Sequence, residues 1–247
     1  MSLAKTVQRA FAACGLNLTR LPENRFDAMP GVLRRLAREG FAPTLIIDAG
    51  ANLGQWARTA SGVFPAVPLH LIEPQPACRP ALEAFAAARG SAEVHGAVVT
   101  REGTGRVLMA ASVAGSTGSH VLRDTTGRTD GFQVPATTVD ALLADRLNET
   151  DRVLFKLDVE GHELDVLAGA RAVMRRVEVV ITEVQFYEVT RNGDPTFAEV
   201  LAALAGDGFV LYDFAALASR RRDGRLRLGD VVFVRRDSAL AADDSWA

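Results

Sequence analysis

Four short, mainly apolar runs, each ending on an acid, constrain the fold of this chain more than any other feature. The runs are Thr44–Asp48, Leu69–Glu73, Val153–Asp158 and Val179–Glu183. Such runs are typical of strands that are buried on both faces of a parallel sheet. The carboxyl ends of parallel strands lie along one edge of the sheet, where ligands bind. We therefore expect the four acids to converge on one crevice of net negative charge, suited to a sulfonium, an ammonium, a ribose diol or a metal ion.

The first run passes directly into a glycine-bearing turn, and this turn narrows the choice of ligand. A dinucleotide fingerprint has three glycines that let the backbone contact a pyrophosphate. Here Gly50 is followed by Asn52 and Gln55 where the second and third glycines would stand. An acid such as Asp48, directed into the turn, would repel a phosphate but attract a cation or accept hydrogen bonds. The turn therefore favours a nucleoside without a pyrophosphate, and S-adenosylmethionine fits that description.

The acid that ends the second run supports a nucleoside ligand. Glu73 follows Asp48 at about the spacing at which an acid of the second strand holds ribose hydroxyls in such folds. NAD-dependent enzymes share this spacing, so an NAD-dependent oxidoreductase remains an alternative. A noncatalytic nucleoside-binding domain is a second alternative.

Composition and charge restrict the class of protein further. A chain of 247 residues with 48% apolar composition can bury the core of one domain. The net charge of −2 gives no general reason to expect nucleic acid or an anionic membrane as a partner. No apolar run approaches the roughly 18 residues of a membrane span. The two cysteines, Cys14 and Cys78, lack metal-type spacing and suit a reducing compartment, so we expect a cytoplasmic protein.

The remaining segments alternate between helical and extended patterns. Helices are predicted at residues 30–40, 80–89, 138–147, 163–175 and 196–205, and further strands at residues 92–99, 209–214 and 230–235. This alternation, closed by a β-hairpin, resembles the class I methyltransferase sheet. The resemblance implies a Rossmann-like α/β fold with seven mostly parallel strands, a C-terminal antiparallel hairpin and helices on both faces. We expect a helical extension at residues 1–40, the main domain at 41–236 and a tail at 237–247.

Two segments stand apart from this pattern. Residues 103–135 are rich in glycine and lack helical periodicity, which is typical of a functional or poorly ordered loop. We expect a lid here that orders on ligand binding and that a protease cuts between Arg123 and Arg128 in the ligand-free protein. The arginine-rich segment Arg220–Arg227 is interpreted as a solvated turn, with capture of an anionic acceptor as the alternative.

Several motifs resemble one particular family. The segment Phe155–Leu164 reads Phe-Lys-Leu-Asp-Val-Glu-Gly-His-Glu-Leu, and it is the most specific of them. Together with Ile47–Gly54, Ile72–Pro74 and Thr138–Leu142, it resembles the FkbM-type methyltransferases over roughly residues 36–236. The resemblance implies an S-adenosylmethionine-dependent O-methyltransferase that acts on a hydroxyl of a sugar, glycan or other small natural-product acceptor.

The strand ends and the resemblance together predict the cofactor-binding residues. The predicted set is Asp48, Gly50, Ala51, Asn52 and Gly54 around the methionine end, Glu73 and Pro74 at the ribose, Ala97 and Val98 at the adenine, and Asp158. Two segments depart from the family pattern. Val94–Ala97 lacks the usual asparagine before the alanine, and Gly115–Ser119 stands where Gly-Ser-Ser-Ser is more common. The first departure affects an adenine contact, and the second affects contacts to the substrate and to the methionine end of the cofactor.

Methyl transfer to oxygen also needs a proton acceptor, because an alcohol is a poor nucleophile until its proton is accepted. We predict Asp158, Glu160 and His162 as the catalytic residues, all at the edge of the crevice. The alternative for His162 is a solvated histidine at a helix start, and Glu163 is more simply a dipole or capping residue. A magnesium ion held by Asp158 and Glu183 would instead lower the pKa of the acceptor hydroxyl. Without the metal, Glu183 could anchor a substrate hydroxyl.

Overall fold

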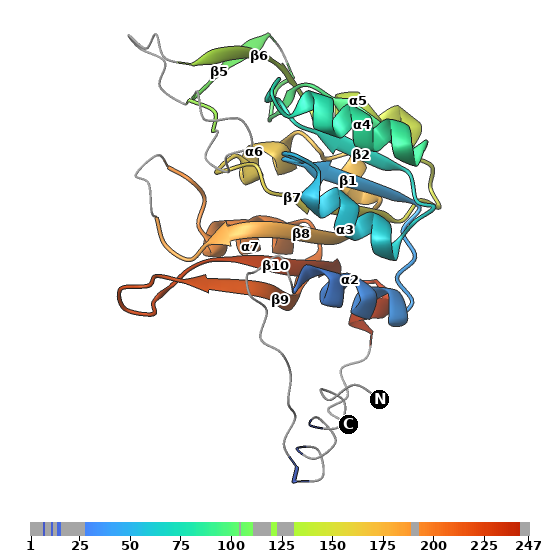
Figure 1. The fold of residues 1–247 in the computed structure, drawn as a ribbon, viewed down its shortest axis with the longest axis vertical. Helices are drawn as coiled ribbons and strands as arrows, with labels where there is room; N and C mark the ends of the chain where they lie inside the picture. The colour runs from blue at the N-terminus through green and yellow to red at the C-terminus, as the bar shows by residue number, and fades with distance from the viewer. Residues whose placement is uncertain are drawn as a thin grey trace.

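The computed structural model describes residues 28–103, 105–110, 120–122, 131–188 and 193–242, together with Val7, Phe11, Cys14 and Gly15. A seven-stranded sheet forms its centre (Figure 1). The strands are β1 (Leu45–Ala49), β2 (Leu69–Ile72), β3 (Ala92–His95), β7 (Val153–Leu157), β8 (Val177–Gln185), β9 (Phe209–Ser219) and β10 (Leu226–Arg235). Their order is β3-β2-β1-β7-β8-β10-β9. The first five pair in parallel, whereas β10 is antiparallel to both β8 and β9. The expected fold class is confirmed.

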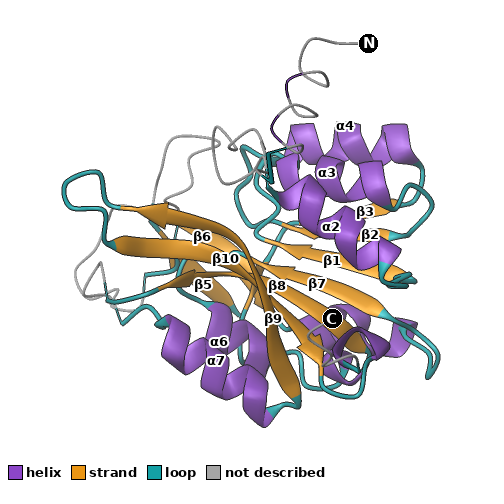
Figure 2. Ribbon diagram, turned by 90° about the horizontal axis from the view of Figure 1, so that it is seen from below, coloured by secondary structure: helices purple, strands orange, loops and turns teal. Residues whose placement is uncertain are grey.

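Helices cover both faces of the sheet, which explains why its central strands are apolar throughout. One face carries α2 (Met29–Arg38), α3 (Gln55–Val63) and α4 (Arg79–Arg89). The other carries α5 (Val139–Leu143), the 3₁₀ turns η2 (Ala144–Arg146) and η3 (Val173–Arg175), α6 (Glu163–Ala168) and α7 (Phe197–Gly206) (Figure 2). Ile46 and Leu154 pack into the first core, and their neighbours Ile47 and Phe155 pack into the second. All four are completely buried, and burial of such a side chain contributes about 1.5–3 kcal/mol.

The prediction of a single strand at residues 92–99 is wrong. β3 ends at His95, and β4 (Val98–Val99) leaves the main sheet to pair with β6 (Phe132–Thr137). β6 also pairs with β5 (Arg106–Met109), so β4, β6 and β5 form a second, three-stranded sheet. The break follows from tertiary packing, because Val98 is buried against Met109 and Val134 rather than against the main core.

The prediction of one helix at residues 163–175 is also wrong, because α6 ends at Ala168. A side chain at Gly169 would place its Cβ 2.1 Å from the carbonyl oxygen of Thr100, so the chain turns here against a neighbouring backbone. The segment resumes as η3. At its start, the N–H groups of Ala172 and Val173 donate hydrogen bonds of 2.9–3.0 Å to the carboxylate of Asp140. The helix expected at residues 138–147 likewise stops at Leu143 and continues as η2.

The two terminal segments are described only in part. Leu33 and Leu36 of α2 are completely buried in the core that also holds Ile46, so this part of the expected extension packs on the sheet. At the other end, the turn η4 (Ala239–Ala241) buries Leu240 in the same core. Residues 1–27, apart from four, and residues 243–247 lie outside the described chain. We propose the division at residues 40 and 236 on this basis.

Most of the expected lid lies outside the described residues. Within residues 103–135, the structure describes β5, residues 120–122 and the start of β6, but not the Gly115–Ser119 stretch or the cleavage site at Arg123–Arg128.

In the arginine-rich turn between β9 and β10, Arg220 pairs with Asp223. Among the described helices, none is long and apolar enough to cross a membrane.

Candidate active site

The turn after β1 brings two strand ends into close contact. The N–H groups of Gly50 and Ala51 both donate to the carbonyl of Ile72, at 2.9 and 3.1 Å. Gly50 has a φ of +79°, and a Cβ built on it would lie 1.8 Å from the carbonyl oxygen of Asp158. Asn52 also has a positive φ, of +47°, and Gly54 starts α3 at +80°. The ends of β1 and β7 therefore meet at a separation that only glycine permits.

This contact makes a prediction about stability. Gly50→Ala should lower the free energy of unfolding by at least about 2 kcal/mol, because the new methyl group meets backbone and the φ becomes strained. Gly62→Ala in α3 is the matched control, since nothing lies within 4 Å of a Cβ at that position. It should change stability by no more than about 1 kcal/mol, in the stabilising direction. Denaturant unfolding measures both, and equal effects would contradict the close approach.

Glu73 follows β2 and connects its end to the turn after β1. Its side chain is largely buried, and its two carboxylate oxygens accept hydrogen bonds from the N–H groups of Asn52 at 2.8 Å and Gln75 at 2.9 Å. Burial raises the pKa of this carboxyl, and the two N–H donors oppose that rise. The side chain of Gln75 also hydrogen-bonds this carboxylate, so the group is firmly oriented. A carboxylate has about four acceptor sites, which leaves room for a hydrogen bond from a hydroxyl. Pro74, the next residue, is partly buried.

A buried ion pair that was not predicted from the sequence lies beneath the turn. The Nζ of Lys156 lies 3.0 Å from Asp48 Oδ1 and 3.6 Å from Asp158 Oδ2, and it donates to the carbonyl of Gly50 at 2.7 Å. Asp48 is completely buried, so its carboxylate lies under the turn rather than in it. The available signal was a lysine inside an otherwise apolar run. It stands opposite Asp48 in the β1–β7 register.

The charges of this pair follow from its surroundings. Burial raises the pKa of Asp48, and the ammonium of Lys156 opposes that rise. Burial alone would lower the pKa of Lys156, but the carboxylates of Asp48 and Asp158 outweigh it and raise the pKa above its ordinary value. Lys156 therefore keeps its positive charge at neutral pH, directly below the edge where the strands end.

The segment after β7 departs from the extended conformation that we expected. Glu160 has a φ of +51° and Gly161 one of +93°, so strand alternation does not place Asp158 and Glu160 on one side. A Cβ on Gly161 would lie 2.3 Å from Asp194 Oδ1, which brings a third acid to this segment. His162 is buried, with its Nε2 3.8 Å from Asp165 Oδ2, so the alternative of a solvated histidine is wrong.

The side chain of Glu163 binds the backbone of the segment after β7. It is buried, and its Oε1 accepts from the N–H groups of Val159 and Gly161, both at 3.3 Å. Burial raises the pKa of this carboxyl to about 7, with the nearby Asp158 adding to the rise. The hydrogen bonds agree with a structural, capping role for Glu163.

This raised pKa predicts a dependence of stability on pH. As the pH rises from 4.5, the ordinary pKa of a glutamate, to about 7, the unfolded chain loses the Glu163 proton before the folded protein does. The free energy of unfolding should therefore fall across this window and level off above it. Relative to Glu163→Gln, the wild type should lose roughly 3 kcal/mol between these limits. Denaturant unfolding at several pH values measures the difference, with the exposed Glu83→Gln as the control. Parallel curves for wild type and Glu163→Gln would contradict the assignment.

The remaining predicted residues occupy less central positions. Ala97 is partly buried just beyond β3, whose last carbonyl, on His95, accepts from the N–H of Glu73 at 3.0 Å. The side chain of Val98 packs into the small second core. Glu183 does not end its strand, because β8 continues to Gln185.

Magnesium does not fit the arrangement around Asp158. The ammonium of Lys156 already lies 3.6 Å from the Asp158 carboxylate, where a divalent cation would be repelled. In the part of the chain that the structure describes, neither Asp158 nor Glu183 belongs to a group of three converging ligand side chains.

The sheet order, the antiparallel β10 between β8 and β9, and the glycine turn after β1 define the Rossmann-like fold of class I methyltransferases. The sequence matches the family described as the methyltransferase FkbM domain over residues 48–211, well over half of the chain. The chain therefore belongs to the methyltransferase FkbM family.

Solved structures of methyltransferases resemble the chain at low sequence identity. A methyltransferase FkbM from Methylobacillus flagellatus KT has 14% identity and a TM-score of 0.49, over 92% of this chain and 58% of that one. The chain thus spans 58% of the length of that relative. The magnesium protoporphyrin IX methyltransferase of Synechocystis PCC 6803 with bound S-adenosylmethionine has 12% identity and a TM-score of 0.47, over 95% and 98% of the two chains. No curated protein matches the sequence.

Proposed function

We propose that the protein transfers the methyl group of S-adenosylmethionine to a hydroxyl oxygen of a sugar, glycan or other small natural-product acceptor. One observation carries this proposal. Two acids in different surroundings lie at one edge of the sheet, around the glycine turn. Glu73 is buried and oriented by two backbone N–H groups, whereas the side chain of Asp158 is 26% exposed beside Lys156. The first suits a bound nucleoside, and the second suits contact with an acceptor.

The cofactor residues are assigned within this proposal. Glu73 and Pro74 hold the ribose, and the turn of Gly50, Ala51, Asn52 and Gly54 surrounds the methionine end. Ala97 and the backbone of Val98 lie at the adenine. Because the carboxylate of Asp48 is buried, it acts indirectly, by holding Lys156 under the turn. When bound, S-adenosylmethionine supplies an electrophilic methyl group on a sulfonium.

The chain's own acids do the proton chemistry. Asp158 or Glu160 accepts the proton of the acceptor hydroxyl while the oxygen forms its bond to the methyl carbon, opposite the breaking bond to sulfur. Lys156 orients Asp158 from below. His162, buried beside Asp165, is the third candidate acceptor. The proposal places the protein in the cytoplasm, where Cys14 and Cys78 stay free thiols.

Calorimetric titration with S-adenosylmethionine tests the cofactor site. We expect binding to the wild type, and a loss of affinity of roughly ten- to a hundredfold in Glu73→Ala, because contacts of a charged acceptor to two hydroxyls disappear. Glu73→Gln, which keeps one acceptor oxygen, should bind with intermediate affinity. Glu83→Ala removes an exposed acid of α4 that pairs with Arg79, and it should bind like the wild type. Failure of the wild type to bind S-adenosylmethionine would refute the proposal, and binding of NADH instead would favour an oxidoreductase.

The acceptor is best found by a direct search. Extracts of the source cell, incubated with the enzyme and S-adenosylmethionine, should yield a product heavier by one methyl group in mass spectrometry. The product should form about 10²–10⁴-fold more slowly with Asp158→Asn, as expected for the loss of a general base. Cofactor binding without any methylated product would favour the alternative of a noncatalytic nucleoside-binding domain.

A further inference from the structure

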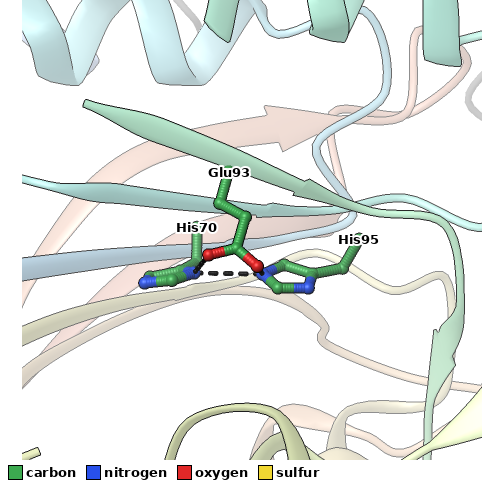
Figure 3. A group of neighbouring side chains, drawn as sticks. All are labelled: His70, Glu93 and His95. Carbon is green, nitrogen blue, oxygen red and sulfur yellow. Dashed lines mark hydrogen bonds and ion pairs between the residues drawn. The ribbon is translucent and has the colours of Figure 1, made fainter. Parts of the chain in front are cut away.

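Three ligand-type side chains meet on β2 and β3, outside the candidate active site. His70 lies on β2, with Glu93 opposite it in the register and His95 two residues further along β3. Residues two apart on a strand point to the same face, so all three side chains converge. The Nδ1 of His70 is 3.0 Å from the Nε2 of His95, and the Glu93 oxygens lie 3.8 and 3.9 Å from these two nitrogens. Figure 3 shows the carboxylate over the gap between the rings.

The two imidazoles are well shielded from solvent. Their side chains are 10% and 9% exposed, against 47% for Glu93, so the group is open to solvent on the carboxylate side. Burial lowers the pKa of His70 to about 4 and also lowers the pKa of His95. Both rings are therefore neutral at pH 7, and each has a nitrogen lone pair to donate.

We propose that His70, Glu93 and His95 form a zinc-binding site. Two imidazole nitrogens and one carboxylate oxygen are a ligand set typical of Zn²⁺, with bonds of about 2.0–2.2 Å. Ligand atoms around a tetrahedral ion with such bonds are roughly 3.3–3.6 Å apart, close to the separations of 3.0–3.9 Å found here. Magnesium and calcium prefer all-oxygen sites, which this group does not offer. The fourth position is left to a water molecule.

The location indicates what the ion does. β3 is the edge strand of the main sheet, and a zinc ion would join it to β2 through side chains. The carbonyl of His95 also accepts the hydrogen bond from the N–H of Glu73, the proposed ribose ligand. The site therefore fastens the edge of the sheet next to the cofactor-binding end, and it takes no part in the methyl transfer.

Arg146 of η2 competes with the ion for Glu93. Its guanidinium is paired with both carboxylate oxygens. An ion bound to the two imidazoles must share or displace this partner, so removal of the guanidinium should strengthen binding. A variant without this guanidinium should therefore bind zinc more tightly. A general loss of structure would weaken binding and could not produce that result.

Untagged full-length protein, freed of metal with a chelator, should be titrated with zinc chloride in a calorimeter. We expect one Zn²⁺ per chain, no response to magnesium chloride, and a rise in the thermal unfolding midpoint when zinc is present. His70→Ala and His95→Ala should each weaken binding at least about tenfold. Arg146→Gln should tighten binding, whereas His120→Gln, which changes a histidine outside the group, should leave it unchanged.

A second test uses cobalt in the wild-type protein, so it does not depend on whether the variants fold. Wild-type protein with one equivalent of Co²⁺ should show the intense visible absorption of a four-coordinate ion, and Glu93→Gln should alter that spectrum. Absence of this absorption, together with no zinc binding stronger than that of magnesium, would overturn the proposal. The two histidines would then be a simple hydrogen-bonded pair. Equal zinc binding by wild type and the double variant His70→Ala/His95→Ala would overturn it as well.

Discussion

Lys156→Met should lower the free energy of unfolding by about 3–5 kcal/mol, because it leaves the buried carboxylate of Asp48 without its counter-charge. Asp48 is completely buried, and the ammonium at 3.0 Å is its ion-pair partner. Chemical denaturation with a fluorescence or circular dichroism signal measures the change. Arg79→Met, which breaks an exposed ion pair with Glu83 on α4, is the control and should cost less than about 0.5 kcal/mol.

A double variant separates the ion pair from simple loss of packing. Asp48→Leu combined with Lys156→Met replaces both charges by apolar groups, and it should recover most of the stability lost in Lys156→Met. It should nevertheless bind S-adenosylmethionine poorly, since the carbonyl of Gly50 loses the ammonium that fixes the turn. If the double variant is as unstable as the sum of the two single variants, the pair does not act as a unit.

Asp158→Asn and Glu160→Gln should reduce turnover by about 10²–10⁴-fold, the range typical of losing a general base. Cofactor affinity should stay within a few fold, because neither side chain is the proposed ribose ligand. His162→Gln should matter much less, since that ring is buried beside Asp165 and away from solvent. Turnover is measured with the identified acceptor and affinity by calorimetry.

Comparing the turnover of Asp158→Asn with that of Glu160→Gln shows which of the two acids accepts the proton. The positive φ of Glu160 departs from extended backbone, so its side chain does not follow the alternation of the strand β7 that precedes it. The variant with the larger loss marks the proton acceptor, provided that its unfolding curve matches the wild type. Abolished turnover in His162→Gln alone, with both acid variants active, would show that the roles are assigned wrongly.

The outline of the fold could be predicted because it depends on local patterns. Apolar runs such as Val153–Asp158 have the length and composition of strands buried on both faces, and the glycine turn after the first run marks the ligand end of the sheet. The α7 helix could be predicted at its start as well, since Thr196 and Glu199 form a capping box. These features need no knowledge of distant contacts.

The parts that could not be predicted depend on which segments meet. Asp48 and Lys156 pair because β1 and β7 are neighbours in one register, and the sequence does not state that register. The break after β3 depends on Val98 packing against Met109 and Val134, and the end of α6 depends on Gly169 lying against Thr100. The conformation of Glu160 is set by a turn that strand alternation does not describe. The breaks after β3 and α6 thus arose from tertiary contacts that overrode a local pattern.

The insertion of β10 between β8 and β9 also has a consequence for biosynthesis. β8 is made first, but its outer edge is paired by β10, and the earlier β9 lies one strand further out. At 5–20 residues per second, the segment between the two strands takes roughly 2–8 s to synthesise. Throughout that interval the nascent chain exposes the unpaired N–H and C=O groups of a long, apolar strand, which is a template for pairing with other chains.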